Sequence, residues 1–208
     1  MAEEESLIYK NNPELVRDIN RLWMPVYAGL ARQVAEICRC APQRILELGC
    51  FSGGTGLALL KIFPNAELTV ALDMPELVST FREDWDCRDE NRLVIKKIVL
   101  NRWFLSEQKF DLVFCRGAFF FLAPDVKIVP KIYDLLEKDG AAFWGGGYGR
   151  YTPDAVIEKI GDESRIKNNA LGRRIYSVAQ LETLLKLSDL ADRSEIIEAG
   201  GLWVLMRK

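Results

Sequence analysis

The stretch ILELGCFSGGTG, residues 45–56, decides the fold of this chain. It begins with apolar residues typical of a buried strand, contains a carboxylate at Glu47, and ends in closely spaced glycines. A glycine-rich turn between a strand and a helix lets the backbone approach a ligand and adopt positive φ. Where many nucleotide-binding loops have their second glycine, this chain has the bulky Phe51. The stretch therefore predicts a ligand-binding turn that includes an aromatic ring.

Strand and helix patterns alternate on both sides of this turn. Apolar residues at helical spacing cover residues 13–39, and Pro25 is expected to divide them into two helices. Further helices are predicted at 54–63, 75–85, 126–140, 153–161 and 178–188. Gly140 is expected to close the third of these helices, and Pro130 to interrupt or kink it. Strands are predicted at 43–49, 67–73, 92–100, 109–117 and 141–149, and a closing hairpin at 194–208.

This alternation determines the expected fold class. Strands that alternate with helices form βαβ units, whose right-handed crossovers give a parallel sheet covered on both faces. We therefore expect an α/β fold: a Rossmann-like, doubly wound, mostly parallel seven-stranded sheet with a C-terminal antiparallel hairpin and an N-terminal helical cap. No repeat, low-complexity tract or linker divides the sequence, so residues 1–208 are expected to form one domain, with a cap at 1–40 and a core at 41–208.

Composition and charge exclude several classes of function. The 208-residue chain is 49% hydrophobic and 28% charged, which is ordinary for a globular protein. With a formal net charge of −2 and no dense basic block, it is not expected to bind nucleic acid. The acidic N-terminus lacks the apolar segment of a signal peptide, and no apolar run is long enough to cross a bilayer. We expect a cytoplasmic protein without membrane contact, and leave open whether it forms a homodimer.

Two residue types limit the chemistry further. The five cysteines are odd in number and scattered, apart from a C-x-C at Cys38 and Cys40, which predicts free thiols rather than disulfides or a metal site. The chain has no histidine, which rules out an imidazole base and any zinc site that needs histidine. No metal ligand is therefore assigned.

Asp73 closes the strand that follows the glycine-rich turn. In a doubly wound sheet the ligand lies at the carboxyl ends of the strands, where a carboxylate accepts hydrogen bonds from ribose hydroxyls. Glu47 distinguishes two kinds of nucleotide, because an anion directed into the loop would repel a pyrophosphate. S-adenosyl-L-methionine has no phosphate and carries an ammonium and a sulfonium, both of which suit a carboxylate. The sequence therefore predicts a site for this cofactor.

Four segments resemble the class I S-adenosylmethionine-dependent methyltransferases. ILELGCFSGGTGLALL (45–60) and LTVALDMPELV (68–78) are similar to the first two motifs of that superfamily. KFDLVFCRGAFFFL (109–122) and LLEKDGAAFWGGG (135–147) are similar to its fourth strand and to the glycine turn into its fifth strand. The resemblance covers about residues 40–146 and is nearest to small-molecule methyltransferases of the broad type 11 kind.

This resemblance implies which residues contact the cofactor. By the match, the loop and the end of the following strand contribute Glu47, Gly49, Cys50, Phe51, Gly53, Asp73 and Met74. Glu47 and the loop glycines would line the methionine end, Asp73 would bind the ribose, and Met74 would flank the adenine. Some O-methyltransferases of the catechol and caffeoyl-CoA type have a G-x-F-x-G loop, so the ring of Phe51 is expected at the rim of the pocket.

Two departures from the family pattern concern the adenine and the base. After the third strand, where an acidic residue often faces the adenine amine, this chain has Asn101, so Asn101 or a backbone carbonyl must serve. A histidine that is frequent after the fourth strand of the family is missing. Methyl transfer from a sulfonium is an in-line SN2 displacement in which the protein mainly positions the nucleophile and excludes water. We expect this reaction to run on a small-molecule methyl acceptor without a histidine base.

The loops after the fourth and fifth strands should face the acceptor. They offer Arg116, Phe119, Trp144, Tyr148, Arg150 and Tyr151. We assign catalytic roles to Arg116, which can orient an anionic acceptor bidentately and also contact the cofactor, and to Tyr148 as a hydrogen-bond donor or weak base. The glycines in GGGYG, residues 145–149, either form a flexible exit from the strand or let the substrate approach the backbone. Near the N-terminus, Tyr27 is expected to cover the cofactor.

Two other functions stay open. A non-catalytic S-adenosylmethionine-binding module is suggested by the missing base and the missing adenine acid. A nicotinamide-dependent oxidoreductase is less compatible, because it needs G-x-G-x-x-G spacing and a loop that accepts a pyrophosphate. The loop here reads GCFSGGTG and follows Glu47 closely. Cofactor binding and methyl transfer distinguish the three hypotheses.

Overall fold

The computed structural model describes residues 8–85, 87, 90–98, 108–120 and 126–208. Within these ranges the strands form one seven-stranded sheet in the order β3-β2-β1-β4-β5-β7-β6. The first five strands of the chain pair in parallel, whereas β7 is antiparallel to both β5 and β6. The predicted mostly parallel, doubly wound sheet with an antiparallel C-terminal hairpin is confirmed.

Six of the described strands have four to seven residues and β5 has 11. The strands are β1 (Arg44–Leu48), β2 (Glu67–Leu72), β3 (Leu93–Lys97), β4 (Phe110–Arg116), β5 (Leu136–Gly146), β6 (Ser194–Ile197) and β7 (Leu202–Arg207). Residues of β1, β2 and β4 are buried almost without interruption rather than in alternation. Continuous burial is what a parallel sheet covered on both faces requires.

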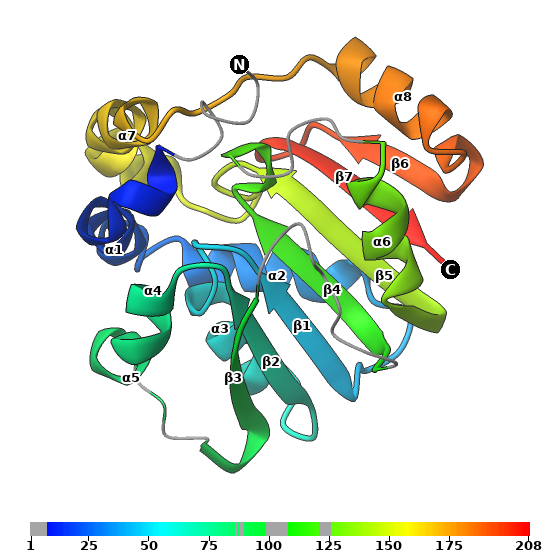
Figure 1. Cartoon of the computed structure of the whole chain (residues 1–208), viewed down its shortest axis with the longest axis horizontal. Helices are drawn as coiled ribbons and strands as arrows, with labels where there is room; N and C mark the ends of the chain where they lie inside the picture. The colour runs from blue at the N-terminus through cyan, green and yellow to red at the C-terminus, as the bar shows by residue number, and fades with distance from the viewer. Residues whose placement is uncertain (1–7, 86, 88–89, 99–107, 121–125) are drawn as a thin grey trace.

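Helices cover the sheet on both faces (Figure 1). They are α1 (Pro13–Leu22), α2 (Tyr27–Ile37), α3 (Gly54–Ile62), α4 (Pro75–Ser79), α5 (Phe81–Asp84), α6 (Ile128–Asp134), α7 (Asp154–Ala170) and α8 (Val178–Leu187). Short 3-10 turns occur at Tyr9–Asn11, Glu90–Arg92, Ala118–Phe120 and Ala191–Arg193. In Figure 1, α2 and α3 lie together behind the sheet, α6 lies in front near β5, and α1 lies beside α7 beyond the carboxyl ends of the parallel strands.

Sequence periodicity predicted most boundaries within a few residues. The division at Pro25 is confirmed, since α1 ends at Leu22 and α2 begins at Tyr27. The helix expected at 75–85 is divided at Thr80 into α4 and α5. The helix expected at 153–161 continues to Ala170, because a single interior glycine is tolerated where a helical face packs on the core.

The prediction of a helix at 126–140 was wrong about where the helix ends. The helix α6 stops at Asp134, and Gly140 lies inside β5 instead of closing the helix. Pairing of β5 with β4 begins at Leu136 and resumes at Ala141, so the register shifts and the residues between them form a bulge within the strand. Asp139 in this bulge has a φ of 65°. Strand pairing thus overrode the local helical pattern.

The glycines of the 145–149 segment have a structural cause. At Gly147 a Cβ atom would lie 2.3 Å from the carbonyl oxygen of Gly200, and the φ of 151° also favours glycine. The turn between β6 and β7 therefore packs directly against the backbone that leaves β5. Gln33 of α2 fixes this packing by donating to the carbonyl of Ala199 (3.1 Å) and accepting from the N–H of Arg150 (2.8 Å). The segment is a packed exit from the strand.

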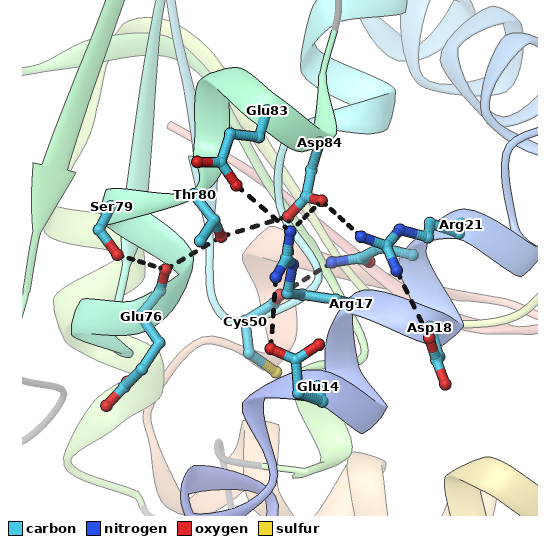
Figure 2. A network of polar contacts seen from close by, with 11 residues as sticks. Glu14, Arg17, Asp18, Arg21, Cys50, Glu76, Ser79, Thr80, Glu83 and Asp84 are labelled. Carbon is cyan, nitrogen blue, oxygen red and sulfur yellow. Dashed lines mark hydrogen bonds and ion pairs between the residues drawn. The ribbon is translucent and has the colours of Figure 1, made fainter.

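An arginine-carboxylate network joins α1 to α5. Figure 2 shows the guanidinium of Arg17 facing the carboxylate of Asp84, with N–O distances of 2.7 and 2.8 Å, and Arg21 donating to the same group at 3.1 Å. Burial opposes ionisation of Asp84, but the hydrogen bonds and charges of these arginines together lower its pKa. The network holds the N-terminal helix against the segment that follows β2. Among the described helices, none is long and apolar enough to cross a membrane.

Candidate functional site

Glu47 lies inside the glycine-rich loop, at the carboxyl end of β1, and is fully buried. Its Oε2 atom accepts hydrogen bonds from the N–H groups of Gly53 (2.7 Å) and Gly56 (2.9 Å). A Cβ atom at position 56 would lie 2.6 Å from this oxygen, so only glycine fits there. The other carboxylate oxygen, Oε1, is buried and has no hydrogen-bond partner among the described residues. The loop therefore presents an acidic oxygen that lacks a partner.

The environment of Glu47 raises its pKa. Burial raises the pKa to about 7, although the two backbone N–H groups and the charge of Arg116 partly oppose the shift. The carboxyl group is therefore close to half ionised at neutral pH in the unliganded protein. A cation placed beside it would complete the ionisation.

Asp73 follows β2 at the same end of the sheet and is 7% exposed. Its Oδ2 atom accepts a hydrogen bond of 2.5 Å from the hydroxyl of Tyr9, whereas Oδ1 is buried without a partner among the described residues. Burial raises the pKa of Asp73, and the hydrogen bond from Tyr9 partly opposes the shift. The structure thus places a second acidic group, with one oxygen that has no partner among the described residues, at the same end of the sheet as Glu47.

Two aromatic rings cover the glycine-rich loop. At Gly54 a Cβ atom would lie 2.4 Å from the ring of Tyr27, and at Gly53 it would lie 2.7 Å from the indole nitrogen of Trp85. The two rings meet edge to face, with centroids 5.5 Å apart. Burial raises the pKa of Tyr27 to about 12, so its hydroxyl stays protonated at neutral pH. Tyr27 packs directly against the loop at Gly54, and its role in covering a cofactor stays a prediction.

The guanidinium of Arg116, at the end of β4, is 4% exposed and surrounded by aromatic rings. Its centre lies 4.4 Å from the ring centroid of Trp23, 4.8 Å from that of Phe51 and 5.4 Å from that of Tyr27. Its Nη2 atom donates to Asn20 Oδ1 (2.8 Å), to the Tyr27 hydroxyl (3.1 Å) and to the Phe51 carbonyl (3.3 Å). Its buried Nε atom has no partner among the described residues.

A cavity of about 420 Å³ opens beside Arg116, at the carboxyl ends of β4 and β5. Ring pairs form its walls: Trp23 stacks on Tyr148 with centroids 4.7 Å apart, and Phe119 meets Tyr176 at 5.1 Å. Trp23 is fixed by its indole N–H, which donates to Ser164 of α7 at 2.9 Å. The volume is in the range of sites for small molecules.

Comparisons with known proteins agree with this arrangement. No protein-family model matches the chain. A solved structure from Methanococcus maripaludis, described as an S-adenosylmethionine-dependent methyltransferase, has a TM-score of 0.76 at 20% identity and covers 96% of this chain and 93% of that chain. PigF, solved with SAH, has a TM-score of 0.65 at 16% identity and covers 95% of this chain and 60% of that chain. This chain has the class I methyltransferase fold.

Curated relatives carry a similar description. The malonyl-[acyl-carrier protein] O-methyltransferase of Bacillus cytotoxicus is 27% identical over 161 residues, which cover 72% of this chain and 52% of that protein. The enzyme of the same name from Bacillus cereus is 27% identical over 156 residues, covering 69% of this chain and 53% of that protein. The chain thus spans about half the length of these curated relatives.

Within this methyltransferase fold, the other residues expected at the cofactor have mixed positions. Phe51 is buried and lines the cavity beside Arg116, and its place at the rim of a cofactor pocket stays a prediction. Met74 is buried at the start of α4, next to Asp73.

Cys50 is buried and its carbonyl accepts a hydrogen bond from the side-chain amide of Asn20 at 3.3 Å. Burial raises the pKa of its thiol. Gly49 adopts a φ of 99° and donates its N–H to the Ala71 carbonyl. Asn101 lies outside the described residues.

On the acceptor side, Arg116, Phe119 and Tyr148 line the cavity, but three other candidates do not. Trp144 is 1% exposed, within the core. Arg150 and Tyr151 bind Glu36 of α2 instead. Residues that sequence reasoning missed at this side are Arg165, Arg173, Arg174 and Tyr176. They come from α7 and the link to α8, which have no motif, so no local signal could have assigned them.

Proposed function

We propose that this protein is an S-adenosylmethionine-dependent methyltransferase that acts on a small molecule. The observation on which the proposal depends most is the occupation of the glycine-rich loop by Glu47. The N–H groups of Gly53 and Gly56 donate to its carboxylate, so they are not free to bind a pyrophosphate. This argues against a dinucleotide and favours a ligand with a positive charge.

The residues present fit the proposed cofactor. The unpartnered Oε1 atom of Glu47 suits the ammonium of a methionine group, and the unpartnered Oδ1 atom of Asp73 suits a ribose hydroxyl. When bound, S-adenosylmethionine supplies an electrophilic methyl group on a sulfonium. The loop residues Gly49, Cys50, Phe51 and Gly53 would lie along it, with Met74 and Tyr27 closing over it.

The protein's own contribution is to position the acceptor and exclude water. Arg116 and Tyr148 line the same cavity, and each packs against the ring of Trp23. Both are candidates to orient the acceptor. Aromatic rings form much of the lining, which keeps the reacting groups away from bulk water. Because the chain has no histidine, the acceptor must be nucleophilic without an imidazole base.

Relatives guide the choice of acceptor only broadly. The curated relatives are named for O-methylation of malonyl-[acyl-carrier protein], and the plantazolicin methyltransferase BpumL, with TM-scores of 0.56 and 0.60, was solved with desmethylPZN analogs and SAH. We place this chain among enzymes with low-molecular-weight or carrier-bound acceptors, working in the cytoplasm without nucleic acid. The sequence pI of about 5.5 supports the last point.

Calorimetric titration tests the cofactor assignment. S-adenosylhomocysteine should bind the full chain in the micromolar range or tighter, whereas NAD should give no heat of binding. Tight binding of NAD with no response to S-adenosylhomocysteine would instead support the oxidoreductase.

Turnover separates the enzyme from a non-catalytic binding module. One observation favours the non-catalytic module: Asp73, the acid expected to bind the ribose, already accepts a hydrogen bond from the Tyr9 hydroxyl. Incubation with methyl-labelled S-adenosylmethionine and a small-molecule extract should transfer label to an extractable product. Binding of S-adenosylhomocysteine without any labelled product would favour the module.

A further inference from the structure

The cavity beside Arg116 has an unusual charge for this protein. Its lining among the described residues includes four arginines and no aspartate or glutamate, although the chain as a whole has a formal net charge of −2. The arginines are Arg116, Arg165, Arg173 and Arg174. A concave site lined by charges of one sign focuses their field on whatever enters it. The lining therefore selects for an anion.

Arg116 provides the buried part of this positive site. All of its hydrogen bonds go to neutral oxygens, and it forms no ion pair with a described residue. Its Nε atom is buried without a partner. A buried cation that forms no direct ion pair with a described residue is costly, and an anionic ligand would relieve that cost. Glu47 is the carboxyl group whose pKa responds to Arg116, and its own carboxylate is bonded to the loop backbone.

The link between α7 and α8 provides the outer part. Arg174 is half-buried, Arg173 is exposed, and neither forms an ion pair with a described residue. The N–H of Arg173 donates to the carbonyl of Asn168 at 3.1 Å, which fixes the start of the link on the end of α7. Arg165 is exposed and already paired with Asp162. Of these three, Arg174 is the arginine whose charge water screens least.

The cavity walls indicate the rest of the ligand. Trp23 and Phe119 are buried, and the half-buried rings of Tyr148 and Tyr176, which rest on them, are the most exposed aromatic surface among the described lining residues. Rings of this kind bind flat apolar groups by stacking or edge contacts. The ligand therefore combines a flat apolar body with an anionic end.

We propose that the methyl acceptor is an organic carboxylate with a flat apolar body, whose carboxylate binds Arg116 and Arg174. A planar carboxylate matches the planar fork of a guanidinium, which can donate two parallel hydrogen bonds to it. A carboxylate is also ionised at neutral pH, so it suits a cavity that has no histidine, lysine, aspartate or glutamate among its described lining residues. The term acceptor rests on the proposed function, but the binding of a carboxylate by this cavity does not.

Fluorine NMR with matched probes tests this proposal on the full chain. The probes are 4-fluorophenylacetate, its neutral amide, and 4-fluorobenzyl phosphate, each titrated with and without saturating S-adenosylhomocysteine. The carboxylate should bind at least about tenfold more tightly than the amide, because a charge-assisted bidentate pair is lost in the amide. It should also bind more tightly than the phosphate.

Variants assign the preference to the two arginines. Arg174→Gln and Arg116→Gln should each reduce the preference for carboxylate over amide to about threefold or less. The matched control is Arg44→Gln, which removes an ion pair with Glu137 at the start of β1, away from the cavity, and should leave the preference unchanged. If Arg116→Gln fails to fold, Arg174→Gln decides alone, because its side chain is not part of the buried core.

Three results would overturn the proposal. They are equal binding of carboxylate and amide, a preference that survives both substitutions, and tighter binding of the phosphate, which would assign a different anion. The proposed function can fail separately. If the carboxylate binds as expected but S-adenosylhomocysteine does not, the cavity assignment stands and the cofactor assignment falls. If S-adenosylhomocysteine binds but the carboxylate does not, the cofactor assignment stands and the cavity assignment falls.

Discussion

The proposed site at the carboxyl ends of the strands has two halves that differ in charge. The cofactor half surrounds Glu47 and Asp73, and the acceptor half is the cavity beside Arg116. On the cofactor half, Glu47 and Asp73 are buried acids whose pKa values are raised and whose second oxygens have no described partner. On the acceptor half, Arg116 and Arg174 belong to a lining without a described acid. Burial of each charge without a partner destabilises the folded chain. The two proposed ligands would balance this difference, the ammonium of one beside the acids and the carboxylate of the other beside the arginines.

The halves also differ in how they are built. Glu47 is fixed by the N–H groups of its own loop, whereas Asp73 accepts a hydrogen bond from Tyr9, 64 residues away in the sequence. The arginine half is assembled from β4, α7 and the link to α8, which are far apart in sequence. A ligand-binding loop can thus be encoded locally, whereas the second pocket depends on how the helices pack.

The largest effect is expected from filling the space beside Glu47. Gly56→Ala places a Cβ atom 2.6 Å from Glu47 Oε2 and 2.8 Å from the Leu68 side chain, so the carboxylate must move. We expect binding of S-adenosylhomocysteine to weaken by about 100-fold, and the free energy of unfolding to fall by about 1–3 kcal/mol, as in overpacked cores. Calorimetry and thermal unfolding measure the two effects.

A matched control for this change is Gly161→Ala in α7. There the new Cβ atom would meet only the Tyr148 hydroxyl, at 3.9 Å. Alanine replaces glycine inside a helix, so stability should rise by about 0.5–1 kcal/mol with cofactor affinity unchanged. Normal binding by Gly56→Ala would show that the position of Glu47 does not matter to the ligand.

Removing the second acid should have a smaller effect. Asp73→Ala is expected to weaken binding of S-adenosylhomocysteine by about 1–3 kcal/mol, the scale of a lost buried hydrogen-bond partner. Tyr9→Phe should instead strengthen binding of S-adenosylhomocysteine, because the Tyr9 hydroxyl no longer competes for Oδ2 of Asp73. The free energy of unfolding without ligand should fall by about 1 kcal/mol. Unchanged affinity in Asp73→Ala would exclude Asp73 as the acid that binds the ribose.

The pH dependence of binding should depend on Glu47. The pKa of Glu47 is about 7 in the unliganded folded protein, against an ordinary value of 4.5. Between pH 4.5 and 7, Glu47 therefore holds a proton in the folded state that it loses in the unfolded state. Stability without ligand should therefore fall as pH rises from about 4.5 to 7. The ammonium group of S-adenosylhomocysteine favours the ionised form of Glu47, so the affinity for this ligand should rise by about tenfold from pH 6 to 8. A flat profile in the wild type would contradict this, whereas Glu47→Gln should give one.

The smallest effect is expected where charges are already paired. Asp84→Asn removes the partner of Arg17 and Arg21 in the network of Figure 2, outside both halves of the crevice. Because the pair is partly exposed to solvent, we expect a loss of about 1 kcal/mol in stability, reduced further by salt. The exposed pair of Asp162 and Arg165 provides the control, since Asp162→Asn should not change stability measurably. A larger loss at position 162 than at 84 would reverse this ranking.

The fold could be predicted from the sequence to a large extent. The alternation of apolar strands with periodic helices, and the glycines after Glu47, specify the parallel sheet and its first ligand-binding loop through local propensities and turn chemistry. Asp73 could be placed because a parallel neighbour strand must end at the same edge as β1. By contrast, the end of α6 was mispredicted, since pairing with β4 decided that Gly140 joins a strand.

The sequence by itself thus determined the order of the elements and the acidic half of the crevice, because both are written in residues close together along the chain. Only the tertiary structure decided which distant side chains complete the site: Tyr9 bonds to Asp73 across 64 residues, and Trp23 bonds to Ser164 across 141. The physical reason is that the Trp23 contact depends on the packing of α1 against α7, and the Tyr9 contact on the packing of the N-terminal turn against the end of β2. Neither follows from a local pattern, and neither does the gathering of Arg165, Arg173 and Arg174 at the cavity beside Arg116.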